Sequence, residues 1–157
     1  MKGVEMNKKK VLFICTHNSA RSQMAEGFLR SRYSDKYEVA SAGTIASNVN
    51  PYAIKAMEEI GIDISNHRSK SIEEFKGKIF DYVITVCDHA NETCPFFPGK
   101  VHIHHNFEDP AQVVGSDKEK MDAFRRVRDE ITKWIEENFV KESEENAEFQ
   151  VEKEGLS

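Results

Sequence analysis

The residues best suited to chemistry lie within residues 11–22, where a short apolar run gives way to small and polar residues. Cys15 stands at the predicted end of a strand, and Arg21 stands six residues later, at the predicted start of a helix. A loop at a helix N-terminus directs successive backbone N–H groups to one spot, which attracts an oxyanion. The same donors favour the thiolate form of a cysteine held there. The stretch therefore predicts an anion cradle with a nucleophile at its floor.

Two side chains add to these backbone donors. Arg21 offers a planar fork that can grip two oxygens of an anion, and Ser22 can donate a hydrogen bond to the Cys15 sulfur. The Cys-x5-Arg spacing alone is weak evidence, because a cysteine at a strand end is usually a small buried apolar residue. The strand before it and the helix after it strengthen the functional interpretation.

Composition favours one folded domain with a local rather than a global positive site. The chain has 157 residues and a formal net charge of −5, which gives it no overall attraction to nucleic acid. No apolar run approaches a membrane span, and residues 11–14 are too short for a signal-peptide core. Three cysteines favour reactive thiols in a reducing compartment, so the predicted location is the cytoplasm.

Strands and helices are predicted to alternate. The predicted strands cover residues 11–15, 37–42, 81–86 and 101–105, and the predicted helices cover residues 21–33, 50–60 and 121–139. Asn50-Pro51 is typical of a helix start, and Ser71-Ile-Glu-Glu74 matches a capping box for a short helix. We expect a disordered leader over residues 1–8, one domain over 9–140 and an acidic tail over 141–157. The alternation predicts a parallel α/β sheet.

Ligands of such sheets bind beyond the carboxyl ends of the strands. Cys15 and Cys87 each directly follow a predicted strand, so both are expected at this edge. Asp109-Pro110 follows the last strand, in a loop that could hold a carboxyl group over the cradle as a general acid. An Asp-Pro pair by itself is usually only a turn.

Cys87 and Cys94 allow three interpretations. They are two unrelated buried thiols, or metal ligands, or a redox pair in a mobile loop. A metal site would draw its further ligands from His89, His102, His104 and His105. Its spacing lacks the short Cys-x2–4-Cys knuckle of structural zinc sites, which makes this interpretation the weakest of the three.

The stretch Cys15-Thr-His-Asn-Ser-Ala-Arg-Ser-Gln-Met-Ala-Glu26 resembles the phosphate loop of the low-molecular-weight protein tyrosine phosphatase superfamily. It most resembles the thioredoxin-coupled arsenate reductases built on that fold. Further matching segments are Ser41-Ala-Gly43, Asn50-Pro51, Asp63-Ile-Ser-Asn-His67, Cys87 with Cys94, and Phe107-Glu-Asp-Pro-Ala111. The resemblance covers roughly residues 9–139. It implies a single three-layer domain, in which helices cover both faces of a four-stranded parallel sheet.

The resemblance also implies arsenate reduction without a cofactor. Cys15 would attack arsenic while Asp109 protonates the leaving hydroxide, and Cys87 and Cys94 would carry the resulting disulfide to thioredoxin or a similar reductant. The implied anion-binding residues are Thr16, His17, Asn18, Ser19, Ala20, Arg21 and Ser22, with phosphate and sulfate as competing anions. No nucleic acid or membrane partner is expected.

Two departures from the family pattern affect how these roles are assigned to residues of this sequence. Many relatives have Gly at the position of His17, but histidine tolerates the left-handed conformation better than most residues. Some relatives bind potassium through an Asn, a Glu, a Ser and an Asp. The first three match Asn18, Glu26 and Ser41, but Lys70 stands at the fourth position, and we predict no bound metal.

Two other functions stay open. A phosphotyrosine phosphatase on the same scaffold would share Cys15, Arg21 and Asp109 but have no use for Cys87 and Cys94. A non-catalytic oxyanion or metal sensor would bind its ligand through the cysteines without turnover.

Overall fold

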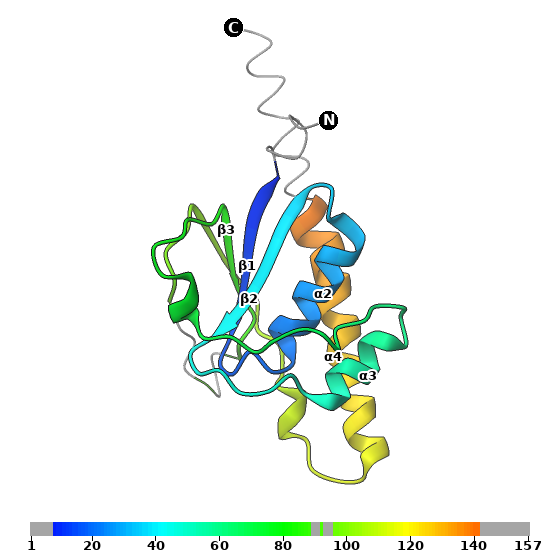
Figure 1. Cartoon of the computed structure of the whole chain (residues 1–157). Helices are drawn as coiled ribbons and strands as arrows, with labels where there is room; N and C mark the ends of the chain where they lie inside the picture. Colours follow the sequence, from blue (N-terminus) through cyan, green and yellow to red (C-terminus); the bar gives the residue numbers. More distant parts are fainter. Residues whose placement is uncertain (1–7, 89–91, 93–95, 142–157) are drawn as a thin grey trace, which may run out of the picture.

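The structure, a computed structural model, describes residues 8–88, 92 and 96–141 (Figure 1). Its sheet is parallel and four-stranded, in the order β2-β1-β3-β4. The strands are β1 (Lys9–Cys15), β2 (Tyr37–Gly43), β3 (Tyr82–Thr85) and β4 (Val101–His104). The predicted fold class is confirmed. Apart from Lys8 and Lys141, the predicted leader and acidic tail lie outside the described residues.

Helices lie on both faces of the sheet. On one face are α2 (Arg21–Tyr33), α3 (Pro51–Glu58) and α4 (Asp117–Trp134), and α4 continues as a π-helical segment, η3 (Ile135–Val140). A 3-10 helix, η1 (Ile72–Phe75), packs on the other face. A second one, η2 (Pro110–Gln112), precedes α4. The second face is therefore covered by one helical turn and its flanking segments rather than by long helices.

Strand β1 is buried on both sides, which explains its continuous apolar sequence. Val11 and Phe13 belong to the large core beneath α2 and α4, whereas Leu12 and Ile14 belong to the smaller core beneath η1. All four side chains are fully buried. A central strand anchored in two cores gives the loop that follows it a rigid start.

The carboxyl ends of β1, β2 and β3 lie level with one another. Cys15 pairs with Gly43 at the end of β2, and Ile14 pairs with Thr85 at the end of β3. Pairing continues past β3, because the Val86 N–H donates to the Ile14 carbonyl at 2.9 Å. The predicted convergence of Cys15 and Cys87 on one sheet edge follows from this register.

The predicted helix caps are confirmed in part. Asn50 caps α3 as expected, with its Oδ1 accepting from the Tyr52 N–H at 2.9 Å. Ser71 caps the predicted short helix, η1, through a hydrogen bond from the Glu73 N–H at 3.2 Å. The Glu74 half of the predicted capping box is wrong, because its carboxylate binds Arg68 instead, at 2.7 and 2.8 Å. The capping box that does form was not predicted, and it joins Ser116 to Glu119 at the start of α4.

Across the described residues, no helix combines the length and the apolar character that crossing a bilayer requires.

Candidate active site

The loop between β1 and α2 turns its carbonyl groups into the protein. The five successive carbonyl oxygens of residues 16–20 each accept at least one hydrogen bond. Their donors are the N–H groups of Ile45, Asn50 and Met24, the Ser69 hydroxyl and the Gln23 side-chain amide. In a trans peptide the following N–H points the opposite way. The N–H groups of residues 17–21 therefore face away from these acceptors, as an anion cradle requires.

The tight path of the loop depends on one left-handed residue and one glycine. Asn18 has φ of 50° and is the one non-glycine residue with positive φ in the described ranges. His17, at which the left-handed conformation was considered, does not adopt it. Gly43 passes directly beneath the loop, and a Cβ atom there would lie 2.7 Å from both Asn18 N and Thr16 O. Only glycine fits beneath this backbone.

A buried polar chain holds the Cys15 thiol. Cys15 Sγ lies 2.8 Å from Ser22 Oγ, which itself accepts a hydrogen bond from Asn18 Nδ2 at 2.8 Å. The orientation of the Asn18 amide is fixed, because its Oδ1 accepts from the obligate donor Lys70 N at 2.8 Å. With its acceptor side engaged by Asn18, the Ser22 hydroxyl can direct its proton at the sulfur. This places a hydroxyl donor beside the Cys15 sulfur.

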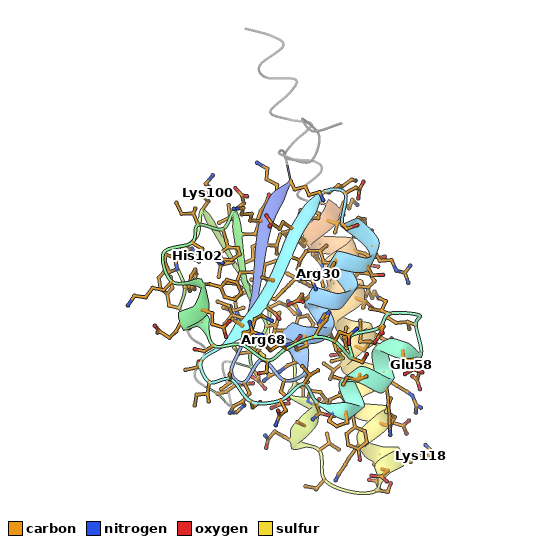
Figure 2. The ribbon with its side chains drawn as sticks, viewed as in Figure 1. Arg30, Glu58, Arg68, Lys100, His102 and Lys118 are labelled. Carbon is orange, nitrogen blue, oxygen red and sulfur yellow. The ribbon has the colours of Figure 1, made fainter. Side chains whose placement is uncertain are left out.

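The same chain continues to a buried carboxylate. Asn18 Nδ2 also donates to Ser41 Oγ at 2.9 Å, and Ser41 donates to Glu26 Oε1 at 2.6 Å. Glu26 is paired with Arg30 on the next turn of α2, and Arg30 in turn lies beside β2 (Figure 2), where it donates to the Val39 carbonyl. Within the described ranges, no buried side-chain nitrogen or oxygen lacks a hydrogen-bond partner.

Lys70 lies at the far end of this polar chain, beside Glu26. Its Nζ donates to the Arg68 carbonyl at 2.7 Å and lies 3.8 Å from Glu26 Oε1. Burial lowers the pKa of Lys70, and the Glu26 carboxylate opposes that effect. An ammonium group therefore lies beside the carboxylate at the end of the polar chain.

Arg21 extends from the start of α2 into the cradle and is almost fully buried. Its Nη1 donates to the Phe107 carbonyl at 3.1 Å and to Glu92 Oε2, and its Nη2 donates to Glu92 Oε1 at 2.8 Å. Burial alone would lower the pKa of Arg21, but Glu92, Cys15 and Asp109 raise it. The guanidinium is therefore a permanent positive charge at the cradle.

Glu92 was missed by sequence reasoning. Besides Arg21, it is bound by the Thr16 hydroxyl at 2.6 Å and by the Asp88 N–H at 3.0 Å. Burial is the largest single influence and raises the pKa of Glu92, but the hydrogen bonds from Arg21, Thr16 and Asp88 together lower it to about 2. The sequence places two carboxylates, Asp88 and Glu92, between Cys87 and Cys94, and nothing in it indicates which of them would reach Arg21.

Asp109 reaches the cradle from the other side. Its Oδ1 caps η2 by accepting from the Ala111 N–H at 3.0 Å, and its Oδ2 lies 3.6 Å from Arg21 Nη2. A cavity of about 150 Å³ is lined by Cys15, Arg21 and Asp109, together with the loop. The structure thus brings a thiol, a guanidinium and a carboxyl group together around a space that suits a small anion.

The two remaining cysteines differ in how far they are described. Cys87 is fully buried just beyond β3 and is disulfide-bonded, whereas Cys15 is a free thiol. Cys94 lies outside the described residues. The pairing of Cys87 with Cys94 stays a prediction.

Sequence and fold together define the class of protein. Residues 10–149 match the model of the low molecular weight phosphotyrosine protein phosphatase family. An arsenate reductase from Halalkalibacterium halodurans is 51% identical over 131 residues, which span 83% of this chain and 94% of the relative. The chain therefore belongs to this phosphatase family and, within it, to the group of the arsenate reductases.

Solved structures agree with this assignment. An arsenate reductase in a phosphate-binding state superimposes with a TM-score of 0.71 at 38% identity, over 85% of this chain and 98% of the other. A thioredoxin-dependent arsenate reductase from Corynebacterium glutamicum has a TM-score of 0.58 at 30% identity. In that comparison the match spans 86% of this chain and 64% of the other. The chain is an enzyme of this group.

Proposed function

We propose that the enzyme reduces arsenate to arsenite through a three-cysteine relay that a thioredoxin-type partner recharges. The observation that carries the proposal is the free Cys15 thiol, which lies on a small cavity together with Arg21 and Asp109. The relatives named arsenate reductases support the substrate, and the thioredoxin-dependent relative supports the reductant. Such a thiol relay needs a reducing compartment, so we expect the enzyme to work in the cytoplasm.

The first step is a displacement at arsenic. The Cys15 thiolate attacks, an As–S bond forms, and an As–O bond breaks. Asp109 supplies the proton with which the leaving hydroxide departs as water. Arg21 and the N–H groups of the loop stabilise the negative charge on the remaining oxygens.

The second step transfers the electrons. The Cys87 thiolate attacks the Cys15 sulfur, an S–S bond forms, and the As–S electron pair stays on arsenic, which leaves as arsenite. Two thiolates are thereby oxidised to one disulfide, and arsenic gains two electrons. Cys94 then attacks Cys87, moves the disulfide to Cys87–Cys94 and frees Cys15 for the next cycle. The partner reduces this last disulfide.

A paired assay separates this function from that of a phosphatase on the same scaffold. Arsenite release with thioredoxin, thioredoxin reductase and NADPH is measured beside aryl phosphate hydrolysis, on the parent, Cys87→Ser and Cys94→Ser. Ester hydrolysis needs only the cradle, Cys15 and Asp109, so any hydrolysis by the parent should persist in both variants. Cys87→Ser should lose reduction, and Cys94→Ser should stop after about one turnover. Full multiple-turnover reduction by both variants would refute the relay and favour the phosphatase.

A further inference from the structure

Glu92 binds the guanidinium that an incoming oxyanion would also need, from outside the cavity beside Cys15. Its two carboxylate oxygens bridge both terminal nitrogens of Arg21, and one of them also accepts from the Thr16 hydroxyl. This is the two-point arrangement by which a guanidinium grips two oxygens of a phosphate or a carboxylate. The carboxylate therefore has the charge and the shape of a bound anion, yet it belongs to the chain.

In this arrangement, both terminal nitrogens of Arg21 already have acceptors. Nη1 serves Glu92 and the Phe107 carbonyl, whereas Nη2 serves Glu92 and faces Asp109 at 3.6 Å. The single positive charge of Arg21 therefore already faces the Glu92 carboxylate on one side and the carboxyl group of Asp109 on the other. A doubly charged oxyanion entering beside Glu92 would add further repulsion. Oxyanion and Glu92 therefore compete for one guanidinium.

The position of Glu92 in the sequence suggests that its binding to Arg21 depends on the redox state of Cys87. It lies five residues after Cys87, which is disulfide-bonded in this structure, and two residues before Cys94. We propose that Glu92 is a tethered competitor of the oxyanion, docked on Arg21 when Cys87 is in a disulfide and withdrawn when Cys87 is reduced. On this proposal, which rests on the proposed relay, the spent enzyme does not hold arsenate or phosphate until the partner has restored its thiols.

The experiment measures the binding of inorganic phosphate by calorimetry to the full chain, both oxidised and reduced with a dithiol. Glu92→Gln keeps the size of the side chain and removes its charge. The matched control is Glu108→Gln, because Glu108 and Glu92 line one cavity next to the cradle, but Glu108 pairs with Arg126 at 2.8 Å. Glu92→Gln should tighten phosphate binding by the oxidised protein roughly 10- to 100-fold, as expected for loss of a charge-assisted competitor. In the reduced protein, Glu92→Gln and its parent should bind alike.

A second measurement follows the thiol. Iodoacetate carries a carboxylate that Arg21 would attract, whereas iodoacetamide is neutral, so the ratio of their rates with Cys15 reports the availability of the guanidinium. Glu92→Gln should raise this ratio in the oxidised protein, and Glu108→Gln should leave it unchanged. A structural role for Glu92 would lower both rates or weaken phosphate binding.

The outcomes distinguish this inference from the proposed function. If the oxidised Glu92→Gln protein binds phosphate no better than its parent, Glu92 is not a competitor, although the cradle and the relay can stand. An equal gain in both redox states overturns the link to the disulfide. If reduced parent and variant both fail to bind phosphate, the anion cradle itself, and with it the proposed function, is wrong.

Discussion

The floor and the rim of the cradle are built in different ways. The floor consists of Cys15, Ser22, Asn18, Ser41 and Glu26, which are buried and joined in one chain of hydrogen bonds. All five lie on β1, β2, α2 or the loop between them. Neighbouring elements therefore fix the thiol before any ligand arrives.

The rim consists of Glu92 and Asp109, which come from distant parts of the sequence and meet at Arg21. Their side chains are 16% and 20% exposed, compared with 4% for Glu26. Asp109 is anchored by one local cap, whereas Glu92 is held by hydrogen bonds from three residues, Arg21, Thr16 and Asp88. The comparison indicates that the floor sets geometry, whereas the rim holds the two groups to which we assign proton transfer and competition with the anion.

The largest expected loss of activity follows from a substitution at the rim. Asp109→Asn should lower the single-turnover rate of arsenate reduction roughly 10²–10⁴-fold, because an amide cannot donate the proton to the leaving hydroxide. An asparagine can still cap η2, so the thermal midpoint should stay close to that of the parent. Rapid-quench measurement of arsenite release tests this. An unchanged single-turnover rate would assign the acid role to another residue.

The floor of the cradle could be predicted from the sequence, because most of its residues are close together along the chain. A strand, a small-residue loop and a helix are read from successive residues, and the level ends of parallel strands bring Cys15 and Cys87 to one edge. Glu92 could not be found this way, because it meets Arg21 across 71 positions of sequence. Neither local pattern nor strand order indicates where a carboxylate in a polar loop will bind.

One local prediction failed for a related reason, and one local conformation was not predicted. The Ser71–Glu74 spacing satisfies the capping-box pattern, but Arg68 offers Glu74 a two-point ion pair that the pattern does not take into account. At the loop, the left-handed residue is Asn18 rather than His17. Asn18 holds that conformation with four side-chain hydrogen bonds to other segments, which sequence spacing alone does not reveal.

A glycine substitution tests whether the floor sets the geometry. In Gly43→Ala the new Cβ would meet the loop backbone at Asn18 and Thr16, so the loop must shift. We expect a loss of roughly 1–3 kcal/mol in the free energy of unfolding. Sulfate should also no longer protect Cys15 from iodoacetamide.

Gly27→Ala is the matched control for this test, because its Cβ would meet a side-chain atom, Ile64 Cγ2, at 2.6 Å. It should lower stability while leaving sulfate protection intact. If Gly43→Ala keeps full protection, the shape of the cradle does not depend on the close passage of β2 beneath it.

The smallest expected effect is on stability, and it concerns His67 and Gln23, which pack behind Asn18 of the floor. His67 Nδ1 lies 3.0 Å from Gln23 Oε1, and Gln23 in turn donates to both oxygens of Asn18. Gln23 Nε2 is a donor in these contacts, so Oε1 is an acceptor and His67 carries its proton on Nδ1. Burial lowers the pKa of His67; Arg30 and Lys70 act in the same direction, against the opposing effects of Glu26 and Asp63.

The sign of the pH dependence follows from this lowered pKa. Below about pH 6.5 the unfolded chain takes up a proton that the folded His67 resists, so stability falls as the pH falls. The slope from one such group cannot exceed roughly 1.4 kcal/mol per pH unit. His67→Gln should reduce the slope between pH 7 and pH 5 without abolishing it, because burial also lowers the pKa of His105. Carboxylates with low pKa values, such as Glu59 at about 2, lose their stabilising contribution mainly below that window. Urea unfolding of both proteins across this range measures the difference. Parallel pH profiles would mean that His67 is not the group responsible, and that the floor is insensitive to protonation at its outer edge.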